Sequence, residues 1–561
     1  MSSAARRRPR GAAILALVLI VLLLWLVLYP NLFVVGDSLI LEGRFTLENY
    51  FRFAASSAEM EALWNSVWIS AASVALSALI GVPLAFLFSR YDFPWRAALG
   101  GLAALPVLLP PLVGVISFLF LYGESGFLAR AVQELLGLER PPWRLTGPSA
   151  ILLVHGYTMY VYFFLFTSAA LSRLDGAMGE AAAALGASRI TTFRRVTLPM
   201  LAPALAGAGL LVFMTSMGSF SAPYVFGGGF RVLSTQIFVS KLNGDLEIAA
   251  VETVILAIVS ILFLIMIQVY EAKRTYTGAG KGTVATLAPA RLGRWGRIGL
   301  TAGATALVGF LLLPHFTVLL VSFVPEGTWT TQLFPPEYST VNYRGLFSDP
   351  ESLTPILNSL QMATVATLAN VVLAFAAGYL LVRRTIRGKA MLSALLILPW
   401  ALPGTVLAIA LATTFSTNQP WAGRFLLIGT FAILPLAYFV RNIPLVTRAA
   451  LASFRQFDPS LEEASASLGA SSAATIRRVV LPLVLPGLAA GALLAFVTAL
   501  GEFVASILLY THRTRPISMA ILSELRAFDF GGAAAYAVFL IILMALVFLT
   551  GYRRVSAVGA E

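Results

Sequence analysis

The sequence predicts an all-α polytopic membrane protein with about twelve transmembrane helices in two pseudo-symmetric halves. Three observations give this prediction. The apolar residues come in long blocks, the basic residues cluster between the blocks, and one pattern occurs twice. Of the 561 residues, 58% are hydrophobic and only 12% are charged, about half the charged share of a soluble domain. Hydrocarbon, rather than water, is a suitable solvent for such a chain.

Each apolar block is long enough to cross a bilayer, which takes about 20 residues of helix. The first block follows a basic stretch, so a signal peptide is the alternative for it. Its apolar run is long for a signal peptide and no small-residue cleavage site follows it, so we expect an anchored helix. The expected spans are roughly 12–30, 63–89, 98–122, 149–171, 201–222, 248–270, 299–324, 356–382, 390–415, 425–447, 484–509 and 532–552.

The net charge of +13 does not indicate a nucleic-acid partner, because the basic residues lie in short clusters between the apolar blocks. Roughly two thirds of the 39 Lys and Arg residues fall in segments that are cytoplasmic if both termini are cytoplasmic. We therefore expect that orientation. The segment 271–298 has no apolar period and is expected to be a cytoplasmic linker. The chain has no cysteine, which excludes disulfides and thiolate chemistry.

One pattern occurs in both halves, with its members 283 residues apart. The first half is expected to comprise residues 1–270, with the pattern in an inner loop at 172–200. The second half is expected to comprise 299–561, with the pattern in a loop at 448–483. The first copy contains Glu180, Ala181, Ala182, Leu185, Gly186, Leu198 and Pro199, and the second contains Glu463, Ala464, Leu468, Gly469, Leu481 and Pro482.

The repeated pattern predicts a short helix in each inner loop. Glu and Ala favour helix, and the acid near the start complements the helix dipole. Gly186 and Gly469 let the chain leave the helix without a Cβ penalty, and the Leu-Pro pair marks entry to the next span. A solvated loop helix is the alternative, but it does not account for two copies in matched loops. We expect each helix to dock into the groove of a partner.

These residues resemble the signature loop of binding-protein-dependent ABC importer permeases. The resemblance covers nearly the whole chain and implies the type I ABC importer permease fold, in which each loop forms a coupling helix that docks into an ATPase subunit. Ser465 stands where the family usually has Ala. Fusion of the two halves is similar to the ferric-iron and thiamine branches and to some phosphonate permeases. The stretch from Gly501 to Tyr510 looks most like ferric iron permeases.

The resemblance implies a permease subunit in the bacterial plasma (inner) membrane, for ferric iron or alternatively for thiamine, a phosphonate or another small solute. Its implied partners are two copies of an ABC ATPase subunit, an extracytoplasmic substrate-binding protein and membrane lipid. The sequence itself also indicates that ATP is hydrolysed by another subunit. The stretch 278–283 lacks the first Gly and the hydroxyl of a phosphate-binding loop and has no preceding strand. We therefore expect no enzyme activity and no cofactor in this chain, with Mg-ATP bound by the partner.

Polar residues within the spans are the candidates for a substrate pathway. Glu502 and its repeat partner Ser219 come first, and a structural hydrogen bond is the alternative role for Glu502. Arg441 is expected to extend to the inner surface, and His155 to be a satisfied interior histidine. Proline stretches at 106–111 and 399–403 are expected to break their spans. No carboxylate or tyrosine cluster marks a ferric site, so metal ligands are unknown.

Two other classes of protein compete with this interpretation. An ion-coupled secondary transporter also carries internal repeats, but it usually keeps several intramembrane charges, which are sparse here. A membrane scaffold without transport activity is the second. Neither explains the paired loops.

Overall fold

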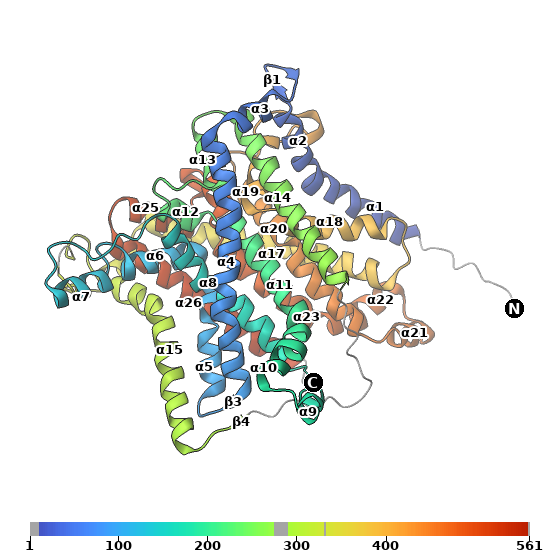
Figure 1. Cartoon of the computed structure of the whole chain (residues 1–561). Coiled ribbons are helices and arrows are strands. Elements are labelled where there is room, and N and C mark those ends of the chain that lie inside the picture. Colours follow the sequence, from blue (N-terminus) through green and yellow to red (C-terminus); the bar gives the residue numbers. More distant parts are fainter. Residues whose placement is uncertain (1–9, 175, 274–289, 330–331, 559–561) are drawn as a thin grey trace. The chain divides into compact units, whose positions relative to one another are not determined.

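The computed structural model describes residues 10–174, 176–273, 290–329 and 332–558 (Figure 1). Most of the predicted linker 271–298, including the stretch 278–283, lies outside the described residues. The described residues are mainly helical, with two small sheets of two strands each. Strand β1 (Ile40–Leu41) pairs antiparallel with β2 (Arg44–Phe45), and β3 (Tyr91–Asp92) pairs parallel with β4 (Ala290–Arg291).

Ten helices in the described ranges are long and apolar enough to cross a membrane, and a bent pair raises this to eleven. The bent pair is α18 (Lys389–Ala401) and α19 (Gly404–Thr414), between which the chain bends by 108°. The predicted span 425–447 corresponds to α20 (Ile433–Gln456), which is not among the ten. A helical, multi-pass protein is thus confirmed, and the count of twelve stays a prediction. The ten are Gly11–Ser38, Ser57–Arg90, Pro111–Leu136, Gly147–Leu171, Arg189–Met217, Leu246–Tyr270, Arg294–Val321, Pro350–Arg383, Ser472–Leu500 and Phe530–Leu549.

The chain forms two compact units. One contains residues 53–242 and 255–338, and the other contains residues 1–52, 243–254 and 339–561. The core of the first unit is a trio of packed helices: α4 (Ser57–Arg90), α8 (Gly147–Leu171) and α11 (Leu198–Met217). The core of the other is the matching trio of α17 (Pro350–Arg383), α20 and α23 (Leu481–Leu500). The repeat seen in the sequence is therefore also a repeat of packing.

The compact units differ from the predicted sequence halves in their first helices. Helices α1 (Arg10–Leu23) and α2 (Tyr29–Ser38) pack on α18 and α19, which come from the second half of the sequence. Trp25 Nε1 donates a hydrogen bond to the Trp421 carbonyl oxygen (3.0 Å) there. In the other unit, α15 (Arg294–Val321) packs on α5 (Arg96–Ala103) and α6 (Pro111–Tyr122) of the first half. Each sequence half thus gives its first helix to the other unit.

In each unit, an Asn-Ser pair near the start of a long helix holds an equivalent loop by hydrogen bonds. Asn65 Nδ2 donates to the Arg231 carbonyl oxygen (2.9 Å), and Ser66 Oγ accepts from the Leu233 amide (2.8 Å). These bonds fix the entry to α13 (Leu233–Leu242). The other unit repeats the arrangement before α25 (Ile517–Arg526), with Asn358 and Ser359 bonded to the carbonyl of Arg515 (3.0 Å) and the amide of Ile517 (2.8 Å).

Both predicted proline stretches interrupt helices, as expected. Residues 106–111 contain part of the 3₁₀ turn η2 (Leu105–Leu108) and the start of α6, and residues 399–403 contain the bend between α18 and α19. The cause is that proline has no backbone N–H and its ring collides with the carbonyl four residues earlier.

The remaining helical elements are η1 (Leu24–Leu28), α3 (Glu48–Ala55), α7 (Phe127–Leu136), α9 (Gly176–Ala184), α10 (Arg189–Thr192), η3 (Phe193–Thr197), α12 (Ser221–Phe226), α14 (Leu246–Lys273), α16 (Val341–Ser348), η4 (Pro420–Ala422), α21 (Ser460–Ser467), α22 (Ser472–Thr475), η5 (Ile476–Val480), α24 (Val504–Leu509), η6 (His512–Thr514) and α26 (Phe530–Val558).

Gly81 lets α4 and α8 approach each other closely, and its replacement should weaken this contact. A Cβ at position 81 would lie 2.3 Å from the Tyr160 carbonyl oxygen and 2.9 Å from the Phe164 amide nitrogen. Both are backbone atoms, so the helices must separate. We expect Gly81→Ala to destabilise the protein by about 1–3 kcal/mol, the usual cost of overpacking. The measurement is the thermal melting temperature in detergent. Gly209→Ala is the control, because its Cβ meets only side-chain atoms at 3.6 Å or more, and an equal loss in both variants would contradict the prediction.

Candidate functional site

The loop at 172–200, which is expected on the inner side, contains the predicted short helix, α9 (Gly176–Ala184), beyond one end of α11 (Figure 1). It ends at Gly186, whose φ of +77° lies in the left-handed region that favours glycine. The Gly186 amide donates to the Ala183 carbonyl (2.9 Å) and the Ala187 amide to the Ala182 carbonyl (3.0 Å). These two bonds form a Schellman motif, which satisfies the last carbonyl groups of the helix and reverses the chain.

The second loop, at 448–483, repeats this construction with α21 (Ser460–Ser467). Gly469 has φ +80°, its amide donates to the Ala466 carbonyl (3.0 Å), and the Ala470 amide donates to the Ser465 carbonyl (3.1 Å). In both loops the residue just before the glycine is a leucine that is almost fully exposed. Leu185 and Leu468 each have an exposed fraction of 89%. The same large apolar side chain is therefore exposed at the equivalent position of both loops.

The other predicted loop residues lie on or just after these helices. Glu180 and Ala181 are exposed on α9, Glu463 and Ala464 are exposed on α21, and Ala182 is half-buried. Glu463 lies in the first turn of its helix, where a carboxylate complements the helix dipole. Their availability to a partner fits the predicted docking role, which stays a prediction.

A π-helical turn joins each loop to the next long helix. The turns are η3 (Phe193–Thr197) and η5 (Ile476–Val480), and they directly precede Leu198-Pro199 and Leu481-Pro482. The Leu198 amide bonds to the Phe193 carbonyl and the Leu481 amide to the Ile476 carbonyl. Each proline would collide with the carbonyl four residues earlier in a regular α-helix, and the wider π turn gives it room. The helices therefore begin at Arg189 and Ser472, well before the predicted starts at 201 and 484.

The two loops differ in how firmly they are tied to the rest of their unit. In the second loop Arg383, at the end of α17, forms an ion pair with Glu462 (3.3 Å). Its guanidinium donates a hydrogen bond to the Phe457 carbonyl and lies 4.4 Å from the centre of the Phe457 ring. Ser465 Oγ and Thr475 Oγ1 are hydrogen-bonded at 2.9 Å. At the matched positions the first loop has Gly179, Leu174 and Ala182, which cannot make these side-chain contacts.

Asp458 adds a further bond to the second loop. The Ser460 amide donates to its carboxylate (2.9 Å) just as α21 begins. Bonds from the Ser460 backbone and side chain lower the pKa of Asp458, and Arg383 has a smaller effect in the same direction. A lowered pKa means that the carboxylate contributes fully above its ordinary range and is lost only as the pH falls through the lowered value. The bond is therefore intact at neutral pH. Its repeat partner Asp175 lies outside the described residues.

Glu502 lies in the turn between α23 and α24, not inside a helical span as predicted. It is buried, with 5% of its surface exposed, and its Oε1 accepts from the Ala505 amide (3.0 Å). Its Oε2 forms an ion pair with Arg441 Nε at 2.9 Å. The expectation that Arg441 extends to the inner surface is replaced by this pair, because Glu502 supplies the charge that the guanidinium needs. Gly404 gives the guanidinium room, since a Cβ there would lie 1.5 Å from Arg441 Nη1.

Ser219, the repeat partner of Glu502, is tied to His155. His155 is buried, and its Nε2 is 2.9 Å from Ser219 Oγ, while its Nδ1 is 2.9 Å from Ser73 Oγ and 3.2 Å from Ser216 Oγ. Both ring nitrogens have partners, which confirms His155 as a satisfied interior histidine. Ser219 and Glu502 belong to different compact units. Their proposed place on a pathway stays a prediction.

Sequence reasoning missed the contacts that hold the second loop. The pattern in the sequence singled out neither Arg383 nor Glu462. The signal was available, because the matched residues of the first half are Arg90 and Gly179, so one loop has an acid that the other lacks. The described residues contain no group of three or more His, Asp or Glu side chains that could hold a metal ion.

Comparisons with known proteins identify the family. The profile of the family "binding-protein-dependent transport system inner membrane component" matches residues 77–276 and 370–555, which together are more than half of the chain. Each match contains one of the two loops.

Two relatives match most of the chain, and a third matches less than half of it. The probable ABC transporter permease protein y4fN of Sinorhizobium fredii is 30% identical over 86% of this chain and 85% of that protein. The ferric transport system permease protein FbpB of Actinobacillus pleuropneumoniae is 28% identical over 95% of this chain and 76% of that protein. The sulfate transport system permease protein CysT of Escherichia coli is 31% identical, over 40% of this chain and 87% of that protein.

Among solved structures, a bacterial ABC transporter involved in the import of alginate aligns with 48% of this chain and 97% of that chain, with a TM-score of 0.38 and 19% identity. The family match and the two relatives that match most of this chain carry the assignment. They also identify the chain as a transport subunit rather than an enzyme. The chain belongs to the binding-protein-dependent transport system inner membrane components of ABC importers, and it matches this family in two separate stretches.

Proposed function

We propose that this permease imports ferric iron across the bacterial inner membrane, with both termini in the cytoplasm. Iron is proposed as the substrate because a ferric transport system permease aligns with 95% of this chain. A second reason is the resemblance of the stretch from Gly501 to Tyr510 to ferric iron permeases. An extracytoplasmic binding protein delivers the substrate, as the family description implies.

The observation that carries the mechanism is the pair of exposed leucines, Leu185 and Leu468, each at the end of a short glycine-capped helix. An exposed leucine at the tip of a thin helix suits insertion into a groove of a partner. We assign one copy of an ABC ATPase subunit to each loop, so that two copies bind the permease. Mg-ATP binds to those subunits, and this chain binds no cofactor.

The loops transmit the movement of the ATPase to the membrane helices. ATP-driven closure brings the two loops together, and the helices change from inward-facing to outward-facing. Each loop is continuous with a long helix, at Arg189–Met217 and Ser472–Leu500, so a displacement of the loop is transmitted along a stiff element. Substrate then moves along a path in which Ser219 and Glu502 take part.

Sulfate is the second candidate substrate, because a sulfate permease matches 40% of this chain. That match covers one half of the fused chain at most, whereas the ferric relative matches nearly all of it. Thiamine and phosphonates remain alternatives from the resemblance of the fused form.

The test is substrate uptake by the purified permease, reconstituted in vesicles with its ATPase and binding protein. We expect uptake of ⁵⁵Fe³⁺ that requires ATP, and no uptake of labelled sulfate or thiamine. Uptake of another solute in place of iron would refute the proposal that ferric iron is the substrate. Uptake that follows an ion gradient without ATP would refute the mechanism and favour the secondary transporter.

A further inference from the structure

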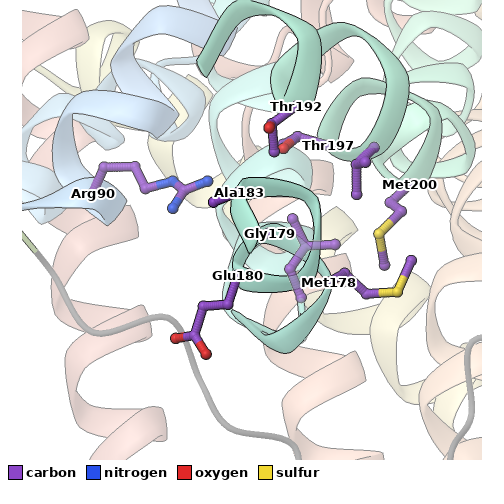
Figure 2. A pocket seen from close by; sticks show the side chains of 10 residues that line it. Arg90, Met178, Gly179, Glu180, Ala183, Thr192, Thr197 and Met200 are labelled. Carbon is purple, nitrogen blue, oxygen red and sulfur yellow. The ribbon is translucent and has the colours of Figure 1, made fainter. Parts of the chain in front are cut away.

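A cavity of about 270 Å³ lies beside the first coupling helix, within one compact unit (Figure 2). Arg90, from the end of α4, forms one wall and extends toward α9. Gly179 and Ala183 of α9 form another wall, and Met178 and Met200 add apolar surface. A Cβ added at Gly179 would meet no atom within 4 Å, so a side chain from this position could enter the space.

The second half of the chain shows what chemistry fits such a site. Arg383, which matches Arg90, pairs there with Glu462, which matches Gly179. The Phe457 ring also lies against that guanidinium, and the smaller Leu174 takes its place in the first half. In the described part of the chain Arg90 makes no ion pair of its own. The first half therefore keeps the cation but has glycine where the second half has the paired carboxylate, and the neighbouring Glu180, which also lines the cavity, forms no ion pair with Arg90.

We propose that this cavity receives an acidic side chain, Asp or Glu, of the ATPase subunit that docks on the first coupling helix. The inference rests on the proposed function, since it assumes that an ATPase binds this loop. The cavity is continuous with that interface, because Glu180 and Ala183 lie both on the coupling helix and in the cavity wall. Glu180 does not prevent the contact, because in the second half the Arg383–Glu462 pair forms although Glu463, which matches Glu180, is the next residue in the sequence.

The two loops then hold their ATPase subunits differently. The second loop completes its ion pair within the permease. In the first loop, Arg90 forms the equivalent ion pair with the acidic side chain of the ATPase subunit. This ion pair adds to the apolar contact that the exposed leucine of the loop makes with the same subunit. A guanidinium and a carboxylate in a half-enclosed site bind more strongly than an exposed pair.

The test is to supply the missing acid within the permease. Gly179→Glu should place a carboxylate on Arg90, as Glu462 does on Arg383, and exclude the partner's acid. We expect the affinity of the purified ATPase subunit for the permease in nanodiscs to fall about tenfold. Gly179→Gln fills similar space without charge, Gly179→Ala controls for the greater helix propensity of alanine, and both should stay within about twofold.

Arg90→Gln completes the cycle. It should also weaken binding about tenfold, and the Arg90→Gln/Gly179→Glu double variant should be no weaker than either single variant, because both remove one contact. The chain has no cysteine, so Gly179→Cys carries a single site for a photoreactive label. The labelled residue should crosslink to a segment of the ATPase that contains Asp or Glu.

Several outcomes would overturn the inference. Equal losses in the Gln and Glu variants would show that charge is not recognised. Unchanged ATPase affinity in Gly179→Glu, with loss of a bound anionic phospholipid by native mass spectrometry, would assign the cavity to lipid. If Gly186 and Gly469 variants lose the ATPase while Gly179→Glu keeps it, the proposed function stands and this inference is wrong. If the wild-type permease binds no ATPase, the proposed function itself fails.

Discussion

Replacing Gly186 and Gly469 together by valine is expected to abolish binding of the ATPase and, with it, ATP-dependent uptake. Both glycines have a positive φ, of +77° and +80°. A residue with a Cβ costs about 1–2 kcal/mol in this conformation, and a β-branched residue costs more. The Schellman turns should open, and Leu185 and Leu468 should leave their positions. We expect at least a tenfold loss of ATPase co-purification from membranes, scored by mass spectrometry.

Two controls separate the turn from a general effect of substitution. Asparagine tolerates the left-handed region, so the Gly186→Asn/Gly469→Asn variant should keep most of the binding. Gly309→Val, in α15, places the same side chain at a glycine without positive φ and with open space around it, and it should bind the ATPase normally. Full retention of the ATPase by the double valine variant would disprove the docking role of the loops.

The Arg441–Glu502 pair is expected to give the second large effect. Arg441→Met should leave the buried Glu502 carboxylate without its cation. Breaking a buried pair from one side costs about 3–5 kcal/mol, and we expect the lower end because one third of the Arg441 side chain is exposed. Glu502→Gln should cost less, since the amide oxygen can still accept from the Ala505 amide and Arg441 keeps access to water.

The cycle is completed by Arg441→Met/Glu502→Gln, which should be more stable than Arg441→Met alone. The measurement is the melting temperature of the purified protein in detergent. Additive effects would mean that the two side chains do not act as a pair. Transport gives a separate readout: if Glu502 contributes to cation passage, Glu502→Gln should slow uptake while the complex with the ATPase stays intact. Unchanged uptake would remove Glu502 from the pathway.

The internal repeat made much of the site predictable. Helix-forming residues, a glycine and a Leu-Pro pair at one fixed spacing define a local structure, because capping and proline geometry depend on neighbours in sequence. Both loop helices and both glycine turns lie where the pattern placed them. The beginnings of the next helices were predicted too late, because a π turn carries each helix through a proline that usually ends one.

The role of Glu502 could not be read from the sequence. Its partner Arg441 is far away in the chain, and its position in a turn between two helices depends on where α23 ends. The exchange of the first helices between the two compact units could not be predicted from the sequence either. Their apolar composition predicts a span, but any apolar surface of suitable shape can receive them. Neither the packing of α1 on α18 nor that of α15 on α6 has a signal in local sequence.

A helical membrane protein with a duplicated half and two glycine-capped loops could be predicted from the amino-acid sequence alone. These properties depend on hydrophobicity, on local backbone preferences and on a repeat, all of which are local or additive along the chain. The pairing of Arg441 with Glu502, the contact of Arg383 with the second loop and the place of Arg90 at a cavity beside the first loop became visible in the folded chain. A buried charge needs one particular partner, and that partner can come from any distant part of the chain, whereas an apolar surface can pack on many others.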